Sequence, residues 1–385
     1  MRVLYLLTDG FGSGGGVACY NRDFLRALAS FGGGCEVLAL PRAIAGETGE
    51  LPAGLTYDEA AARGKLAYLL RMVCALLSGR RYDFILCGHL NLQPLARIAR
   101  RVGRARSILL LHGIEAWTPP ASSQRRRASR GADWVAAVSR VTLDRFMSWS
   151  DFPRERVSLL PCAVDLRRFT PGEPSPSVLE KYRLGERTVV LTLGRLSSAE
   201  RYKGFDELLD ALPLLRSRRP ELLCVIAGDG DDRRRLEAKA RDLGIFDFVR
   251  FTGYVPEAEL VHLYRAARAF TLAGHGEGFG IVLLEAMACG IPVVASTLDG
   301  SFEAIGGGKL GIAVDPTDQR ALIEGISAAL SRPVGVRPVG LDGFSYEAFE
   351  TRVHGFLARI AASPGLQSGW SEAGGSRNQP YGGKQ

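Results

Sequence analysis

The chain has 385 residues and a formal net charge of +8, and 46% of its residues are hydrophobic and 23% charged. This length is too great for one compact core, so it predicts two domains of ordinary size with the composition of a soluble globular protein. No run of eighteen apolar residues occurs, which argues against a membrane-spanning helix.

Seven cysteines are scattered without a C-x-x-C pair, and the five histidines show no H-E-x-x-H spacing. These patterns argue against a disulfide framework and against a protein-built metal site. They favour reduced thiols in a cytoplasmic protein. The apolar run at the N-terminus is too short for a signal peptide and is interpreted as a first buried strand.

Residues 1–170 alternate between strand and helix patterns. Val3–Thr8 is predicted as a buried strand, the glycine-rich loop Gly10–Gly16 follows it, and Val17–Phe31 is predicted as a helix. Such alternation implies a parallel sheet that is covered on both faces and binds ligands at the carboxyl ends of its strands. Further strands are predicted at Cys35–Leu40, Phe84–Gly88, Ser107–His112 and Trp134–Ser139.

The proline-rich stretch Leu159–Pro176 predicts an inter-domain connection, after which the alternation restarts as a second doubly wound unit. Tyr346–Ala362 is predicted as a helix with Phe349, Val353, Phe356 and Leu357 on one face. The glycine- and serine-rich residues 363–385 predict a disordered tail. The second unit's predicted strands are Val189–Leu193, Leu222–Ala227, Val249–Phe251, Phe270–Leu272, Pro292–Ser296 and Leu310–Val314, and its helices Phe205–Arg218, Asp232–Leu243, Glu257–Ala266, Ile281–Cys289 and Asp318–Leu330.

The segment from Glu277 to Glu285 places two carboxylates eight positions apart, with a Gly-Phe-Gly loop and the first turn of a helix between them. A glycine-flanked helix N-terminus offers free N–H groups and a positive dipole end to an anion. The two carboxylates would flank that anion as acceptors for hydroxyl groups. An anion beside several hydroxyls describes a sugar nucleotide, although an ordinary amphipathic helix with an exposed acid at each end is the alternative.

A second candidate feature follows the strand Val189–Leu193, where Arg195 and Lys203 share a loop that Gly204 closes at a helix start. An arginine fork and a lysine charge in one such loop are suited to a diphosphate, although basic loops are also common on surfaces. His112 follows another predicted strand, which would bring its imidazole to the ligand edge of the first sheet. A structural role for this histidine is the alternative.

The loop Gly10–Gly15 formally matches the dinucleotide pattern G-x-G-x-x-G. The acid that should end the second strand is misplaced, because Glu36 comes at its start, so a nicotinamide or flavin site is disfavoured. The loop could still bind a phosphate, since glycines let backbone N–H groups approach a phosphate closely.

The positive charge is concentrated in residues 1–170, where 24 Lys and Arg face 14 Asp and Glu and give a net charge of +10. Basic runs occur at Arg80–Arg81, Arg97–Arg106 and Arg125–Arg130. A basic face without interleaved aromatic residues suits anionic lipid or pyrophosphate better than nucleic acid, although a solvated arginine-rich surface is the alternative. The helical stretch Leu66–Leu77 is apolar nearly all round, which favours a core helix over a shallow interfacial anchor.

Taken in chain order, these motifs resemble those of the family-four retaining glycosyltransferases, which have the GT-B fold. The resemblance extends over nearly the whole chain and is strongest at Glu277–Glu285. Supporting motifs stand in the expected order at Gly194–Gly204, Ala227–Gly230, Phe251–Val255, Gly311–Pro316 and Phe344–Glu347.

The resemblance implies two Rossmann-like domains facing across a cleft. Residues 1–168 would bind the acceptor and residues 177–344 the nucleotide sugar, while a helix at 345–362 would cross back to the first domain. The family transfers a sugar from a nucleoside diphosphate and keeps its anomeric configuration. This implies a UDP- or GDP-sugar as donor substrate, with no permanently bound cofactor and no nucleic-acid partner.

The resemblance also assigns roles to residues. Arg195 and Lys203 would hold the diphosphate, Glu277 would contact the donor sugar, and Glu285 would bind the ribose. The other residues near the donor would be His112 from the first domain, Gly15 and Gly16 in the first loop, and the amides of Phe279, Gly280 and Ile281.

The expected product is a bacterial surface polysaccharide or glycolipid, built on a glycan or polyprenyl-pyrophosphate-linked acceptor. The expected location is the cytoplasm, with peripheral attachment of the basic first domain to the inner face of the plasma membrane. A nucleotide-sugar-binding subunit without turnover is the competing function, and the intact quartet of Arg195, Lys203, Glu277 and Glu285 argues against it.

Overall fold

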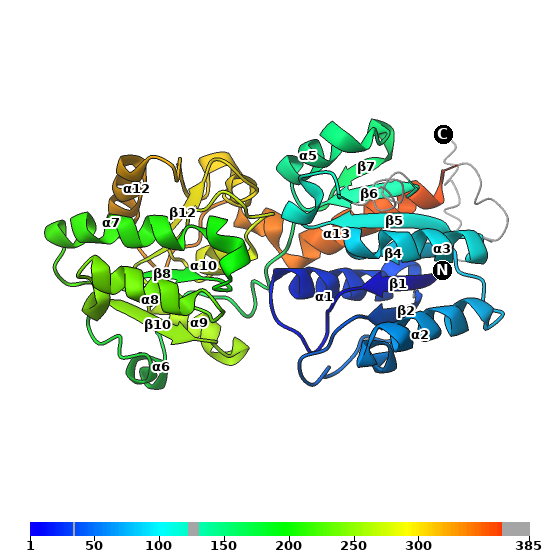
Figure 1. Ribbon diagram of the computed structural model, residues 1–385, viewed down its shortest axis with the longest axis horizontal. Coiled ribbons are helices and arrows are strands. Elements are labelled where there is room, and N and C mark those ends of the chain that lie inside the picture. The colour runs from blue at the N-terminus through cyan, green and yellow to red at the C-terminus, as the bar shows by residue number, and fades with distance from the viewer. Residues whose placement is uncertain (34, 122–130, 364–385) are drawn as a thin grey trace, which may run out of the picture.

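The computed structural model describes residues 1–33, 35–121 and 131–363, which form two lobes joined side by side (Figure 1). The basic run Arg125–Arg130 and residues 364–385 of the predicted disordered tail lie outside this described part. Within it, no helix is long and apolar enough to span a bilayer.

The N-terminal lobe is built on seven parallel strands in the order β3-β2-β1-β4-β5-β6-β7. Its central strands are apolar along nearly their whole length because helices cover both faces of the sheet. The strands are β1 (Arg2–Leu7), β2 (Glu36–Pro41), β3 (Leu55–Tyr57), β4 (Phe84–Cys87), β5 (Arg106–Leu111), β6 (Trp134–Ala137) and β7 (Val157–Leu159), and the helices are α1 (Gly16–Ala29), α2 (Lys65–Leu77), α3 (Gln93–Gly103) and α5 (Arg140–Ser150).

The C-terminal lobe repeats this plan on six parallel strands in the order β10-β9-β8-β11-β12-β13. The predicted pair of doubly wound units is therefore confirmed. The strands are β8 (Thr188–Leu193), β9 (Leu222–Ala227), β10 (Val249–Gly253), β11 (Ala269–Leu272), β12 (Val293–Ser296) and β13 (Ile312–Val314), and the helices are α6 (Pro176–Lys181), α7 (Phe205–Arg218), α8 (Arg233–Asp242), α9 (Glu257–Arg265), α10 (Ile281–Ala288), α11 (Ser301–Ala304) and α12 (Gln319–Ser331).

Two strands were not predicted, and both lie at the edges of the first sheet. β3 and β7 have three residues each, which is too short for a strand to show its alternating pattern. As a result, the predicted inter-domain connection began at Leu159, which is the last residue of β7.

In both sheets the strand order reverses next to the first strand of the lobe, between β1 and β4 and between β8 and β11. In open parallel sheets, ligands bind outside the carboxyl ends of the strands at such a point. The segments that leave these ends are the loop at Gly10–Gly16, the turn at Gly88, the loop at Gly194 and the loop before α10. The topology therefore supports the residues that the sequence proposed for binding.

The last described helix, α13 (Tyr346–Ala361), runs from the C-terminal lobe onto the N-terminal lobe, where it packs against α1 (Figure 1). Phe349 is fully buried, with its ring centroid 5.4 Å from that of Tyr20, and His354 Nε2 lies 2.8 Å from the carbonyl oxygen of Ala27. The predicted apolar face of this helix is confirmed, because Phe349, Val353, Phe356 and Leu357 are all buried.

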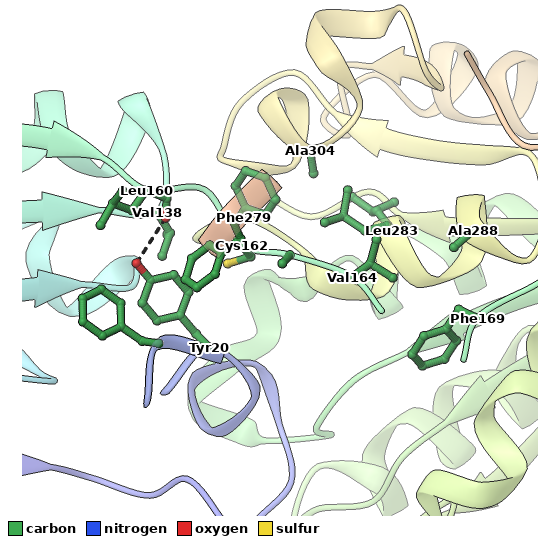
Figure 2. Close-up of a cluster of buried hydrophobic side chains, with 14 of the residues drawn as sticks. Tyr20, Val138, Leu160, Cys162, Val164, Phe169, Phe279, Leu283, Ala288 and Ala304 are labelled. Carbon is green, nitrogen blue, oxygen red and sulfur yellow. Dashed lines mark hydrogen bonds between the residues drawn. The ribbon is translucent and has the colours of Figure 1, made fainter. Parts of the chain in front are cut away.

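A single apolar cluster crosses the boundary between the lobes (Figure 2). It contains Tyr20 of the first lobe, Cys162 of the connection, and Phe279 and Leu283 beside α10. The Tyr20 hydroxyl donates a hydrogen bond of 3.2 Å to the carbonyl oxygen of Leu160. The two lobes therefore meet through a packed interior as well as through a cleft.

Candidate active site

The loop between β11 and α10 turns sharply at Gly280, whose φ of 91° and ψ of 63° are left-handed. A side chain rarely adopts this conformation, so it favours glycine. A Cβ at this position would in addition come within 3.0 Å of Leu283 Cδ1. Among the described residues, no side chain caps the N-terminus of α10. The Leu283 N–H donates to the carbonyl oxygen of Gly280 over 3.0 Å, which leaves the N–H groups of Ile281 and Val282 at the start of α10 for an anion.

Glu277 is held within this loop by Asp299, which the sequence analysis missed. The Glu277 N–H donates to Asp299 Oδ2 over 2.8 Å, and Ser301 donates to the other carboxylate oxygen through its N–H and its hydroxyl, over 3.0 and 2.5 Å. Asp299 is fully buried, and burial raises its pKa to about 6. Its position three residues after β12, at the ligand edge of the sheet, was the available sequence signal.

The two predicted cations, Arg195 and Lys203, lie on either side of Glu200, a second acid that was missed. Arg195 pairs with Glu200, and Lys203 Nζ lies 3.8 Å from Glu200 Oε2. Lys203 also reaches Glu277 Oε2 over 3.4 Å, which brings this lysine and the predicted sugar-binding acid together. The Lys203 side chain is 19% exposed and that of Arg195 is 70% exposed. A diphosphate entering this clamp would compete with Glu200 for both cations.

Glu285 lies one turn inside α10, where the hydroxyl of Tyr264 donates a hydrogen bond of 2.7 Å to its Oε2. Burial raises the pKa of the Glu285 carboxyl, and the hydrogen bond from Tyr264 opposes that shift. Tyr264 is fully buried on α9 and was not predicted, because nothing in its local pattern distinguishes it from a core residue. It holds the Glu285 carboxylate in one orientation.

A cavity of about 620 Å³ lies between the lobes, and Glu285 and Ile281 line it from α10. Three charged residues also line it, where Arg22 pairs with Glu257 over 3.3 Å and Arg168 pairs with the same carboxylate over 3.1 Å. These pairs join α1 and the connection to α9. The cavity is not lined by Arg195, Lys203 or His112. The predicted site is therefore divided between the cavity and the loop that holds Arg195 and Lys203.

His112 lies in the N-terminal lobe, where its Nε2 is 2.8 Å from the carbonyl oxygen of Gly88. A carbonyl only accepts, so Nε2 carries the proton, and burial lowers the pKa of His112 and keeps the ring neutral. Its own carbonyl oxygen lies against Gly278, where a Cβ would come within 1.8 Å of it. The His112 turn and the Glu277 loop are therefore in backbone contact across the cleft.

The first glycine loop also meets α10. Gly15 has a φ of 96°, and a Cβ on Gly16 would lie 3.9 Å from Ile281 Cδ1. The Phe279 side chain, by contrast, is only 2% exposed in the shared apolar cluster, so only its backbone remains for a ligand. Within the described residues, no group of three or more His, Cys, Asp or Glu side chains is arranged to hold a metal ion.

The chain is similar in sequence to known protein families over both of its lobes. Residues 14–168 match the model for Glycosyltransferase Family 4, and residues 179–337 match the model for Glycosyl transferases group 1. A Mycolicibacterium smegmatis protein is 38% identical over 292 residues, which cover 72% of this chain and 74% of that protein. The chain belongs to this glycosyltransferase family. The M. smegmatis relative is a GDP-mannose-dependent alpha-(1-6)-phosphatidylinositol monomannoside mannosyltransferase.

A mannosyltransferase of the same description from Mycobacterium tuberculosis is 40% identical to this glycosyltransferase over 278 residues, which cover 69% of the chain and 71% of the relative. Among solved structures, Anabaena Alr3699/HepE in complex with UDP-glucose aligns with a TM-score of 0.73 at 20% identity. That alignment covers 93% of the glycosyltransferase and all of the Anabaena chain. The structural likeness establishes the GT-B fold. The predicted family is thereby confirmed, and the protein is a hexosyltransferase-type enzyme that uses a nucleotide sugar.

Proposed function

We propose that this enzyme is a retaining hexosyltransferase that transfers a hexose from a GDP- or UDP-sugar to a lipid-linked or saccharide acceptor. The product would be a bacterial glycolipid or surface polysaccharide. The observation that carries the proposal is the contact between Lys203 and Glu277 beside the uncapped N-terminus of α10. The mycobacterial relatives make GDP-mannose the first donor to test and a phosphatidylinositol mannoside the first acceptor.

In this proposal Arg195 and Lys203 bind the diphosphate and displace Glu200 as they do so. An arginine can bind two phosphate oxygens at once, and the shielded Lys203 contributes a point charge close to Glu277. Both charges would stabilise the leaving nucleoside diphosphate in the transition state.

Glu285 and Glu277 bind the two ends of the donor. Glu285, oriented by Tyr264, accepts hydrogen bonds from the ribose hydroxyls, and its place in the interlobe cavity supports this role. Glu277 accepts hydrogen bonds from hydroxyls of the transferred sugar. The backbone amides available between them are those of Phe279, Gly280 and Ile281.

The N-terminal lobe completes the site from the other side. His112 approaches the donor sugar as a neutral imidazole, and its contact with Gly278 supports this placement. Gly16 faces Ile281, and Gly15 and Gly16 together would allow their loop to close over the phosphates.

The chemical barrier lies in the departure of the diphosphate from a sugar with oxocarbenium character. We assign no protein nucleophile, and the acceptor attacks the front face while the leaving phosphate takes its proton. The bond to the diphosphate breaks and the bond to the acceptor oxygen forms on the same face, so the configuration is retained. Closure of the lobes excludes water that would otherwise hydrolyse the donor.

We also assign residues 1–168 to the acceptor and residues 177–344 to the donor, with residues 345–362 crossing back between them. The packing of α13 against α1 supports this division. We place the enzyme in the cytoplasm at the inner face of the plasma membrane, where a lipid-linked acceptor is accessible. The basic excess of residues 1–170 supports that location.

The test begins with thermal unfolding in the presence of GDP, UDP and their common sugars, because a ligand that binds the folded state raises the melting temperature. The stabilising donor, carrying a labelled sugar, is then incubated with membrane-extracted acceptors. NMR of the product establishes its anomeric configuration. Donor-dependent release of a nucleoside diphosphate with a retained linkage supports the proposal, and an inverted linkage or binding without turnover refutes it.

A further inference from the structure

Helix α2 is only half buried, although its sequence favoured a core helix. Tyr68, Met72 and Ala75 form its buried face. On the opposite face Leu66 is 83% exposed and Leu77 is 74% exposed. Sequence periodicity did not separate these faces, because both are apolar. The solvent-facing side of α2 is therefore apolar, although polar residues there would not weaken the packing of the core.

The exposed apolar residues of α2 form one continuous stripe. Its members are Leu66, the adjacent pair Leu69 and Leu70, Val73 and Leu77. Steps of three or four residues connect them, and residues at such steps lie on one side of a helix. The neighbouring helix α3 extends the patch with Ile98 and Val102, which are 52% and 57% exposed. These two helices are in contact. We call these seven side chains the α2–α3 patch.

Positive charge surrounds the α2–α3 patch. Between residues 63 and 104 the chain carries nine lysines and arginines and a single acid, Asp83. Arg71 and Arg100 pair with acids elsewhere in the lobe, at Asp58 and Asp133. Six further basic side chains are exposed at the ends of the two helices, namely Arg63, Lys65, Arg80, Arg81, Arg101 and Arg104.

The shape and charge of the patch favour a lipid surface over a second copy of this chain. Thirteen helical residues extend about 20 Å, and one narrow stripe of that length does not supply the roughly 1,200 Å² that a stable protein interface buries. A fluid bilayer needs no matching shape, since acyl chains adapt to the leucines while anionic headgroups pair with the arginines. A second positively charged copy would also be repelled.

We propose that the α2–α3 patch is the surface through which this enzyme docks onto an anionic membrane. The leucines enter the boundary between headgroups and acyl chains, and the surrounding arginines contact the headgroup phosphates. The patch lies at the outer edge of the N-terminal lobe, away from the C-terminal lobe, so docking leaves the donor lobe unobstructed (Figure 1). Its purpose rests on the proposed lipid-linked acceptor, but vesicle binding requires no turnover, so the two proposals fail separately.

The test compares two double variants of the full-length protein in vesicle co-sedimentation. Leu70→Ser with Leu77→Ser removes two exposed leucines from the patch. Leu214→Ser with Val339→Ser makes the same kind of change at exposed sites of the C-terminal lobe. Vesicles of equal parts phosphatidylcholine and phosphatidylglycerol should bind the first variant about tenfold more weakly than wild type and the second unchanged. Pure phosphatidylcholine should bind all three proteins weakly.

Cys74 provides an independent measurement on the same surface. It is the only exposed cysteine of the seven, all of which lie in the described part of the chain, and it is one helical turn from Leu70 and from Leu77. A polarity-sensitive fluorophore on Cys74 should shift to the blue when the anionic vesicles are added. An unchanged fluorophore spectrum on sedimenting protein refutes the proposal. So does a wild-type dimer that binds no vesicles and dissociates in the Leu70→Ser, Leu77→Ser variant.

Discussion

Replacing Tyr264 with phenylalanine tests whether the orientation of Glu285 controls donor binding. The substitution removes the 2.7 Å hydrogen bond to Glu285 Oε2 and keeps the buried ring, which packs against Phe169 and Phe270. A hydrogen bond to a charged group contributes about 1.5–3 kcal/mol. Because about 1.4 kcal/mol corresponds to a tenfold change, we expect donor affinity to fall by between about tenfold and a hundredfold.

The pH dependence gives this prediction a specific signature. Burial already raises the pKa of Glu285, and the Tyr264 hydrogen bond lowers it, so the variant should have a higher Glu285 pKa than wild type. A carboxyl that accepts from ribose hydroxyls must be ionised, so donor affinity is lost as the pH falls through that pKa. The affinity of the variant should therefore recover towards wild type as the pH rises and Glu285 ionises.

The assay is calorimetric titration with GDP and UDP across the neutral range, beside Tyr182→Phe as a matched control. The Tyr182 hydroxyl donates to Glu259 over 2.5 Å, away from the cavity, so this control loses the same kind of bond. An unchanged affinity and pH profile in Tyr264→Phe would refute the role given to Glu285. Equal losses in the two variants would refute it as well.

Five further substitutions test the rest of the site. Gly278→Ala places a methyl group against the facing turn of the other lobe, so turnover should fall by about a hundredfold while each lobe stays folded. Lys203→Ala or Glu277→Gln should lower turnover by at least about a hundredfold, the scale for one charge-stabilising group. Glu200→Gln should strengthen GDP or UDP binding by up to about fivefold, because a partly exposed ion pair is worth about 0.2–1 kcal/mol. Asp299→Asn should lower turnover about tenfold, since an amide accepts at only one of the two positions.

Two measurements complete these tests. Gly355→Ala, at an exposed position of α13, is the control for Gly278→Ala, because nothing lies within 4 Å of its added Cβ, and a rate as low as that of Gly278→Ala would contradict the steric argument. For Asp299, burial holds the folded-state pKa at about 6, above its ordinary 3.8, so the folded carboxyl retains its proton more strongly than the unfolded one. The wild-type free energy of unfolding should therefore fall as pH rises between these values, and urea unfolding should show that Asp299→Asn lacks this contribution.

The regular part of the fold could be predicted because its patterns are local. The bounds predicted for Phe205–Arg218 and Leu222–Ala227 agree with α7 and β9 at both ends, since long amphipathic and apolar runs specify their own structure. The strands β3 and β7 were missed because three residues carry no period. In α2, the apolar pattern marked a helix but did not show that Leu66 and Leu77 remain exposed.

Only those residues of the candidate site that belong to short sequence motifs could be predicted. Glu277, Glu285, Arg195 and Lys203 were found from their neighbours in the sequence, although their roles remain proposals. Tyr264 and the other residues that orient them act from separate helices and loops. These residues act only because the fold places them beside a carboxylate. A local sequence pattern does not show that placement.

The path of the chain also sets an order of folding during synthesis. α13 supplies part of the cover of α1, where its Phe349 packs against Tyr20 and Phe24, yet it is made after the whole C-terminal lobe. As the chain leaves the ribosome, the second sheet is complete before the first lobe obtains its last helix. Part of the apolar surface of α1 must therefore wait uncovered through that interval. The N-terminal lobe begins first and is completed last.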